Sequence, residues 1–409
     1  MNASYLETGE KISCFGCEAC IQACHFGALR MEDDNEGFRY PKVDNAKCVN
    51  CGQCLKTCPV CRTLDFHDKH HVTFGGYVSD ADLREESTSG GAFSAIALAW
   101  CDKETVVFGA ETIGLEIKHS SIVGVENLQK FRKSKYVQSS IGNAYMDARK
   151  FLASGRKVLF SGTPCQIAGL LAFLGNQSRD NLLTIEVVCE GVPSPHYIRK
   201  FSKWLKDEEM GEVLSIDYRY KDNKRWDFEV MQASLQNPNK GIFKWKIDRW
   251  FNPFWSIWLQ HLMSRPSCYS CPFARKERIA DITLGDLWGV HLYCPELYGH
   301  NGGASLVVCN TEKGKDAFDL ARSNMIGHEL KFDDALRYQG PMRGHIRENP
   351  LRKAFMDDLV EMDYQTLVRK WAMRPSLKLL FQKYVWGNRQ KIWWWNLWHR
   401  KAMKELTKY

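Results

Sequence analysis

Residues 14–24 read CFGCEACIQAC, and residues 48–59 read CVNCGQCLKTCP. Each run carries four cysteines, with two residues between the first three and three residues before the fourth. Four thiolates at this spacing are typical ligands of a [4Fe-4S] cluster, and in two-cluster proteins the fourth cysteine of each run ligates the other cluster. The pattern therefore predicts one cluster held by Cys14, Cys17, Cys20 and Cys58, and a second held by Cys48, Cys51, Cys54 and Cys24.

A pair of zinc knuckles is the competing interpretation, because C-x2-C pairs also hold tetrahedral zinc. Zinc does not account for a third cysteine at the same spacing and a fourth after it, in two copies. We therefore expect residues 1–68 to form a small ferredoxin-like domain in which metal replaces much of the hydrophobic core. The sixteen cysteines, in a chain whose start lacks the features of a secretory signal, indicate metal ligation and a cytoplasmic location.

Residues 69–345 are expected to form a larger α/β domain, because short β-branched runs alternate here with helical patterns. Strands are predicted at 105–110, 157–160, 183–189, 279–284 and 305–310, and helices at 90–100 and 166–174. The aromatic segment 226–265 receives no assignment and is interpreted as an insertion or a lid. With a helical tail at 346–409, the fold class predicted for the chain is α+β.

A second group of cysteines lies in the larger domain. Cys165 follows a strand and a Gly-Thr-Pro turn at the start of a helix, where the helix dipole favours a thiolate. Cys189 ends the next strand, so a right-handed β-α-β connection brings both to one edge of the sheet. Cys268 and Cys271 supply a further pair. Spacing alone leaves two interpretations open, a third [4Fe-4S] cluster or two buried apolar cysteines beside a solitary C-x2-C turn.

Six short motifs occur in this chain in the same order as in a known protein family. They are SGGAFS (89–94), SKYVQS (134–139), GTPCQIAG (162–169), VCEGVPSP (188–195), SCYSC (267–271) and ADITLGD (280–286). Together they resemble the coenzyme F420 hydrogenase/dehydrogenase beta-subunit family, in its bacterial type with an N-terminal two-cluster ferredoxin domain. The resemblance implies an FAD-binding domain with a third [4Fe-4S] cluster at Cys165, Cys189, Cys268 and Cys271. It also implies a link to cell-surface polysaccharide metabolism. Many bacterial relatives have a histidine where this chain has Glu190. The substrate of such a relative is therefore a weaker guide to the substrate of this chain.

Candidate flavin contacts lie in three of these segments. The glycines before the helix at residue 92 allow backbone N–H groups to approach a pyrophosphate, and a plain helix cap explains them equally well. The basic run 131–139 suits phosphate or reduced flavin, and the resemblance favours this over a solvated loop. Residues 281–286 end a strand at the edge where α/β sheets place ligands, although turn capping also explains Asp281 and Asp286. No catalytic residue is assigned. The predicted cofactor contacts are Ser89, Gly90, Gly91, Lys135, Tyr136, Ser139, Thr283, Gly285 and Asp286.

The C-terminal segment combines basic and aromatic side chains. Between residues 374 and 408, nine lysines and arginines accompany one acidic residue, so this segment accounts for the net charge of +8. Tryptophan beside basic residues is typical of helices that bind anionic membrane surfaces. Peripheral contact with the inner membrane face, docking on a partner protein and packing on the chain's own domain all stay open. No stretch has the 18 apolar residues of a membrane span, and the absence of a recognisable motif argues against nucleic acid.

The function expected from these features is a flavin-dependent iron-sulfur oxidoreductase. Electrons from ferredoxin or another one-electron donor are expected to pass through the clusters to FAD and on to a small-molecule or protein acceptor. Flavin is suited to this position, because it converts between one-electron and two-electron chemistry. The alternatives are a non-catalytic electron-transfer subunit of a larger redox complex and a cluster-bearing docking protein without flavin.

Overall fold

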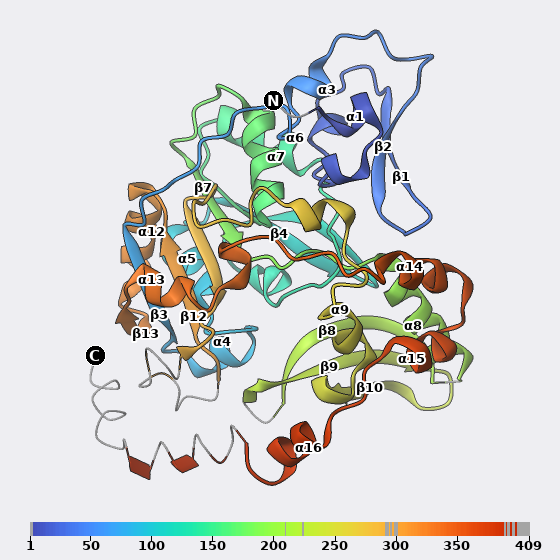
Figure 1. The fold of residues 1–409 in the computed structure, drawn as a ribbon. Coiled ribbons are helices and arrows are strands. Elements are labelled where there is room, and N and C mark those ends of the chain that lie inside the picture. Colours follow the sequence, from blue (N-terminus) through green and yellow to red (C-terminus); the bar gives the residue numbers. More distant parts are fainter. Residues whose placement is uncertain are drawn as a thin grey trace.

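The largest element of the computed structural model is an eight-stranded mixed sheet in the order β13-β3-β12-β11-β7-β6-β4-β5 (Figure 1). The structure describes residues 3–208, 210–222, 225–290, 294, 297, 302–387, 390, 393–394 and 397–398. Strands β4, β6, β7 and β11 pair in parallel, and the remaining neighbours are antiparallel. The strands are β3 (Val72–Val78), β4 (Val106–Ile113), β5 (Glu116–Val123), β6 (Val158–Gly162), β7 (Leu182–Val187), β11 (Ile282–Asp286), β12 (Ser305–Cys309) and β13 (Met325–Glu329).

Helices cover both faces of this sheet, because the side chains of the buried strands alternate between two apolar cores. On β6, Val158 and Phe160 pack with α6 (Ala144–Ala153) and α7 (Pro164–Leu174). Leu159 points to the other core, with α5 (Ala92–Trp100) and α12 (Glu312–Arg322). All five predicted strands and both predicted helices are present, with ends shifted by up to three residues. The α/β prediction for the larger domain is thus confirmed.

The N-terminal domain lies against α6 and α7 (Figure 1). It contains an antiparallel pair of strands and three short helices. The Gln22 side-chain oxygen accepts hydrogen bonds from the backbone N–H groups of Tyr145 and Met146, 3.0 Å each, and thereby satisfies donors at the start of α6. Glu18 accepts in the same way from Gly142 at 3.0 Å. Its elements are α1 (Tyr5–Thr8), α2 (Ala19–Gln22), β1 (Leu29–Asp33), β2 (Arg39–Val43) and α3 (Gln53–Lys56).

A second, three-stranded antiparallel sheet was not foreseen from the sequence. The unassigned segment 226–265 supplies most of β9 (Arg225–Asn237), all of β10 (Gly241–Asp248) and α9 (Pro253–Trp258), and β8 (Glu212–Asp222) completes the sheet. Its two prolines fit this arrangement, because Pro238 follows β9 and Pro253 is the first residue of α9, where a proline is tolerated.

The second sheet shares an aromatic core with helices from two distant parts of the chain. Tyr197 and Phe201 of α8 (Pro195–Asp207) pack there with Phe355 of α14 (Arg352–Glu361) and Leu367 of α15 (Tyr364–Trp371). The start of the segment predicted as a tail is therefore packed, and the domain division at residues 68 and 345 stays a prediction. The remaining helices are α4 (Ala81–Glu85), α13 (Phe332–Leu336) and α16 (Leu377–Tyr384).

Beyond α15 the described residues are largely exposed. On α16, Leu377, Phe381 and Tyr384 are 85%, 54% and 64% exposed, and their spacing places them on one face of the helix. None of the helices in the described ranges combines the length and apolar character needed to cross a bilayer. Several residues of the predicted tail lie outside the described residues, namely Arg389, Lys391, Trp395, Arg400, Lys401, Lys404, Glu405 and Lys408.

Gly169 on α7 sets how closely the N-terminal domain approaches the sheet. A Cβ atom at this position would lie 2.9 Å from the Tyr145 hydroxyl and 3.0 Å from the Cβ of Cys17, both buried residues. Alanine normally stabilises a helix interior by about 1 kcal/mol over glycine. We expect Gly169→Ala to lower the free energy of unfolding instead, by about 1–2 kcal/mol, because overpacking outweighs this gain.

Thermal unfolding of Gly169→Ala measures this effect. Gly340→Ala is the control, because a Cβ at that position would meet nothing within 4 Å. An unfolding temperature equal to or above that of the unaltered protein would show that the approach of Cys17 to α7 is not close.

Candidate functional site

The first predicted cluster site is assembled around a small cavity in the N-terminal domain. Cys14, Cys17, Cys20 and Cys58 line a cavity of about 30 Å³. Burial raises the pKa of Cys17 well above its ordinary value, and the proximity of Cys20, Cys58 and Cys14 raises it further. The structure thus brings together the four thiols that the crossed assignment of the fourth cysteine placed in one set. Their role as ligands stays a prediction.

The second set lies closer to the surface. Burial raises the pKa of Cys54, and Cys24 and Cys48 contribute to the increase, which indicates that these three thiols are neighbours. Cys51 is exposed. The set predicted from the second run and the fourth cysteine of the first run is therefore the one most accessible from solvent.

The four cysteines of the larger domain line one cavity of about 40 Å³. Cys165 is the second residue of α7, which follows β6, and Cys189 lies two residues beyond the end of β7. Since β6 and β7 are parallel, the expected juxtaposition of these two residues is present. Cys268 and Cys271 reach the same cavity from the turn at Pro266–Ser270.

The start of α7 favours the Cys165 thiolate as expected, because the backbone N–H groups of Cys165 and Gln166 lower its pKa, but burial has the larger effect. Burial raises the pKa of Cys165, and this effect outweighs the lowering by the Thr163 hydroxyl and the Arg265 cation. Burial likewise raises the pKa of Cys268 to about 11 and that of Cys271 to about 12. Four partly buried thiols around one small cavity do not ionise together unless a cation compensates their charge, as bound iron would.

The donor chemistry of the three sets fits an iron-sulfur cluster. Each set presents four cysteine sulfurs, the soft ligands that hold a [4Fe-4S] cube. A cube places its four ligands at separate corners, whereas a single ion gathers them in one shell. In the part of the chain that the structure describes, no group of three or more His, Cys, Asp or Glu side chains is arranged to hold a single metal ion.

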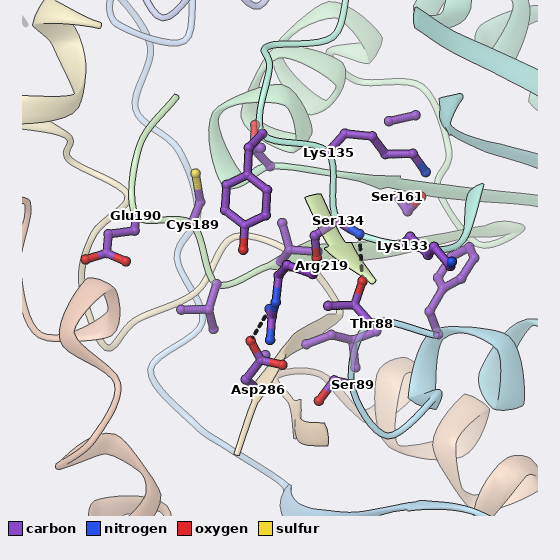
Figure 2. A pocket seen from close by; sticks show the side chains of 18 of the residues that line it. Thr88, Ser89, Lys133, Ser134, Lys135, Ser161, Cys189, Glu190, Arg219 and Asp286 are labelled. Carbon is purple, nitrogen blue, oxygen red and sulfur yellow. Dashed lines mark hydrogen bonds and ion pairs between the residues drawn. The ribbon is translucent and has the colours of Figure 1, made fainter. Parts of the chain in front are cut away.

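A much larger cavity, of about 550 Å³, opens beside the third cysteine set at the carboxyl ends of β6, β7 and β11. Its volume lies within the range of about 300–1,000 Å³ that is usual for cofactor and ligand pockets. Figure 2 shows Cys189 and Glu190 at one end of this cavity and Lys133 and Lys135 at the other. The structure thus has a cavity at the edge of the sheet where a ligand site was predicted.

Most of the predicted cofactor contacts line this large cavity. They are Ser89, Gly91, Lys135, Tyr136, Ser139, Gly285 and Asp286. Gly90 is not among the lining residues, because it packs closely on Gly76 and donates its backbone N–H to the Ser305 hydroxyl at 3.0 Å. Thr283 is also absent from the lining. Its hydroxyl donates to buried Glu186 at 2.8 Å and accepts from Asn310 at 2.9 Å, within the sheet.

The predicted segment 134–139 contacts Thr88, the residue before the predicted segment 89–94, at the cavity wall. The backbone N–H of Ser134 donates to the Thr88 hydroxyl at 2.8 Å (Figure 2). Beside this contact the Lys135 ammonium donates to the backbone carbonyl of Arg132 at 2.6 Å. Burial lowers the pKa of Lys135 to about 8. The wall therefore carries a partly buried lysine whose ammonium faces backbone carbonyls.

Sequence reasoning missed the opposite wall, which the second sheet and α9 supply. Arg219 of β8 reaches across to Asp286 of β11 and forms an ion pair of 2.6 Å (Figure 2). Lys221 of the same strand donates to the backbone carbonyl of Ser89 at 2.7 Å. Trp255 and Trp258 line the cavity. The density of aromatic residues in segment 226–265 was the one signal that could have drawn attention to this wall.

Tyr136 and Ser139 are held in different ways. The Tyr136 ring packs edge-on against Trp255 and Trp258, with centroids 4.9 and 5.2 Å apart. The Ser139 hydroxyl accepts from the Gln166 amide at 2.8 Å and lies 3.0 Å from Nδ1 of His119. Nε2 of His119 lies 3.0 Å from the carbonyl of Ser161, which only accepts, so Nε2 carries the proton and Nδ1 accepts from Ser139.

The cavities are adjacent to one another. Phe15 lines both the first cysteine cavity and the cavity of the larger domain's cysteines. Residues that line both the latter and the large cavity include Gln138, Cys189 and Glu190. The N-terminal thiols, the second cysteine cavity and the large cavity therefore form a continuous row.

A domain rich in cluster-type cysteines that is joined to an α/β domain of this kind defines an iron-sulfur protein of the electron-transfer oxidoreductase class. The family model for the C-terminal part of the coenzyme F420 hydrogenase/dehydrogenase beta subunit matches residues 155–333, and the model for a 4Fe-4S dicluster domain matches residues 13–61. The chain thus combines a segment that matches the coenzyme F420 hydrogenase/dehydrogenase beta-subunit family with an N-terminal 4Fe-4S dicluster domain. The recognition made from the six segments is confirmed.

Two curated relatives are similar over 59 residues, 14% of this chain. The B component of the Na(+)-translocating ferredoxin:NAD(+) oxidoreductase complex of Acetobacterium woodii is 37% identical, and the match covers 16% of its length. The VorC component of the ketoisovalerate oxidoreductase of Methanothermobacter marburgensis is 32% identical, and the match covers 75% of its length. A chain of the F420-reducing [NiFe] hydrogenase complex of Methanosarcina barkeri aligns over 74% of this chain and 91% of its own, with a TM-score of 0.41 and 14% identity.

The hydroxyl of Ser139 is expected to be needed for the stability of the cavity wall. Ser139→Ala leaves Nδ1 of His119 and the Gln166 amide without this partner, and both residues are buried. We expect the free energy of unfolding to fall by about 1–3 kcal/mol, the usual cost of an unsatisfied buried polar group. Denaturant unfolding measures the change. Ser154→Ala is the control, because the Ser154 hydroxyl is exposed, and equal stability of the two variants would contradict the network.

Proposed function

We propose that this chain is a cytoplasmic, flavin-dependent iron-sulfur oxidoreductase that takes single electrons from ferredoxin or a similar donor and delivers them to a two-electron acceptor. The observation that carries the proposal is the continuous row of cavities, in which two cysteine sets and the large cavity share lining residues. Bound clusters would carry single electrons, and bound FAD would convert them to pairs.

The chain's own residues supply the surroundings that such a path needs. The exposed position of Cys51 makes the second N-terminal set the one that a donor protein can approach. Phe15 fills the space between the first N-terminal set and the cavity of Cys165. Cys189 and Glu190 also border the large cavity. Electrons would therefore pass from the third cysteine set into the large cavity along a single wall.

The large cavity suits an anionic cofactor with a flat ring system. Lys135 offers a partly buried positive charge, and the left-handed backbone of Gly91 at the start of α5 keeps that helix terminus free of a side chain. Trp255, Trp258 and Tyr136 provide aromatic surface that excludes water. The ion pair between Arg219 and Asp286 fixes the second sheet against the first, so the cavity has two rigid walls.

A second candidate function is an electron-transfer component of a larger redox complex. It is favoured by the family description, which names a beta subunit, and by the relative from Acetobacterium woodii, which is described as part of a complex. Reduction of a small acceptor by the isolated chain separates the two functions, because an electron-transfer component would need its partner. The link to cell-surface polysaccharide metabolism rests on the family resemblance alone.

We further propose that the C-terminal segment contacts an anionic membrane surface. Leu377, Phe381 and Tyr384 form an exposed apolar face on α16, and exposed Arg374 and Lys378 flank or belong to the same helix. Apolar side chains inserted beside basic ones are how interfacial helices bind acidic lipid.

Iron and flavin contents of anaerobically purified protein test the main proposal. Three [4Fe-4S] clusters predict about twelve irons per chain, with one FAD. We expect Cys165→Ser to reduce the iron content to about eight, because it removes one ligand of the third cluster. Cys101→Ser, at a cysteine outside the three sets, is the control and keeps all the iron. Eight irons and no flavin in the unaltered protein would contradict the third cluster and the flavin, and would leave only the two clusters of the N-terminal domain.

Co-sedimentation with vesicles tests the membrane proposal. The full chain is expected to bind vesicles containing phosphatidylserine and to bind phosphatidylcholine vesicles weakly, whereas a chain ending at Pro375 loses most of this binding. The double variant Leu377→Ser with Phe381→Ser keeps the charge and is expected to bind several-fold less. Equal binding by all three proteins would rule out the C-terminal segment as the contact.

A further inference from the structure

Arg265 is a buried cation at the junction of the two domains. Its side chain is 1% exposed, and it directly precedes the turn that carries Cys268 and Cys271. The guanidinium donates through Nε to the carbonyl of Cys14 at 2.8 Å and through Nη2 to the carbonyl of Arg39 at 3.0 Å. Nη1 donates to the side-chain oxygen of Gln138 at 3.2 Å. All three acceptors are neutral.

The absence of an acidic partner distinguishes Arg265 from other buried arginines. Arg278 pairs with Glu186, and Arg352 pairs with Glu36 at 2.7 Å. Among the described residues, no carboxylate lies within ion-pair distance of Arg265. The Tyr40 ring, 4.3 Å from the guanidinium, offsets part of the cost of burying this charge. A buried charge without a counter-ion is otherwise strongly unfavourable, so the site calls for an anion.

The surroundings of Arg265 supply two places for such an anion. On one side its Nε bonds the backbone of Cys14, a member of the first N-terminal set. On the other side Arg265 lines the cavity of Cys165, Cys189, Cys268 and Cys271. Four thiolates outnumber the positive charge of a [4Fe-4S] cube, so a ligated cluster is an anion that becomes more negative on reduction. Net charge and hydrogen bonding are among the factors that set its reduction potential.

We propose that Arg265 is the counter-cation shared by these two cluster sites and that it raises the reduction potential of both clusters together. This inference rests on the proposed function, since it requires a cluster in each of the two sets. A cation placed between them favours the reduced form of either cluster and changes the difference between their potentials little. Clusters bound at the two sets would exchange one electron, the first being oxidised and the other reduced, with no proton transferred. Arginine suits the position because it stays charged at any working pH.

Redox titration of the anaerobically purified full chain, followed by electron paramagnetic resonance, tests the proposal. Arg265→Gln removes the charge and retains a donor, whereas Arg265→Lys retains the charge. In Arg265→Gln we expect the equilibrium constant for reduction of each flanking cluster to fall about tenfold. This corresponds to a reduction potential lower by about 59 mV for a one-electron couple. Arg265→Lys is expected to stay close to the unaltered protein. The cluster of Cys24, Cys48, Cys51 and Cys54 is the internal control, and its signal is assigned with Cys51→Ser.

Each outcome of the titration decides the question. A fall confined to the two flanking clusters, restored by lysine, supports a shared counter-cation. If Arg265→Gln loses iron, loss of these two clusters alone, with retention in Arg265→Lys, supports it as well. Unchanged potentials with about twelve irons overturn the proposal and leave the proposed function standing. An equal shift or loss of all three clusters also overturns it. Eight irons in the unaltered protein would show that the third cluster is absent, and this inference would then fail together with that part of the proposed function.

Discussion

The contact between the N-terminal domain and helices α6 and α7 is the interaction on which the rest of the molecule depends. Gln22 satisfies backbone donors at the start of α6, and Cys17 lies against Gly169, where α7 has no side chain. Electron transfer between bound groups requires that they lie close together. A domain that carried the same cysteines on a free linker would hold its clusters equally well and would not place Cys14 beside the cavity of Cys165.

The second sheet turns an open edge of the first sheet into an enclosed site. The carboxyl ends of parallel strands normally form a crevice, which β6, β7 and β11 provide here. Arg219 and Lys221 extend from β8 to Asp286 and to the loop at Ser89, so the second sheet is bonded to both sides of that crevice. Because α14 and α15 pack on the same core as β9, part of the C-terminal segment helps to hold this wall in place.

The features predicted correctly from the sequence are those that local spacing or a topological rule determines. The crossed grouping of Cys14 with Cys58 follows from ligand spacing, and the meeting of Cys165 with Cys189 follows from the handedness of a β-α-β unit. Arg219, Trp255 and Trp258 were not foreseen, because their place in the cavity depends on how the segment inserted between β7 and β11 packs against the first sheet. Thr283 was expected at the end of a strand, but it is the second residue of β11, and its hydroxyl donates to the side chain of buried Glu186 within the sheet.

The cations along the proposed path differ in kind, since Arg265 is buried and Lys135 is partly buried, and the difference suits the chemistry proposed at each point. Arg265 lies between two cysteine sets, where electrons move alone and a permanent charge is suitable. Lys135 lies at the large cavity, donates to backbone carbonyls, and has its pKa lowered by burial to about 8. Two-electron reactions of a flavin involve protons as well as electrons. A lysine whose pKa is lowered can both stabilise negative charge and exchange a proton, whereas an arginine there could only do the former.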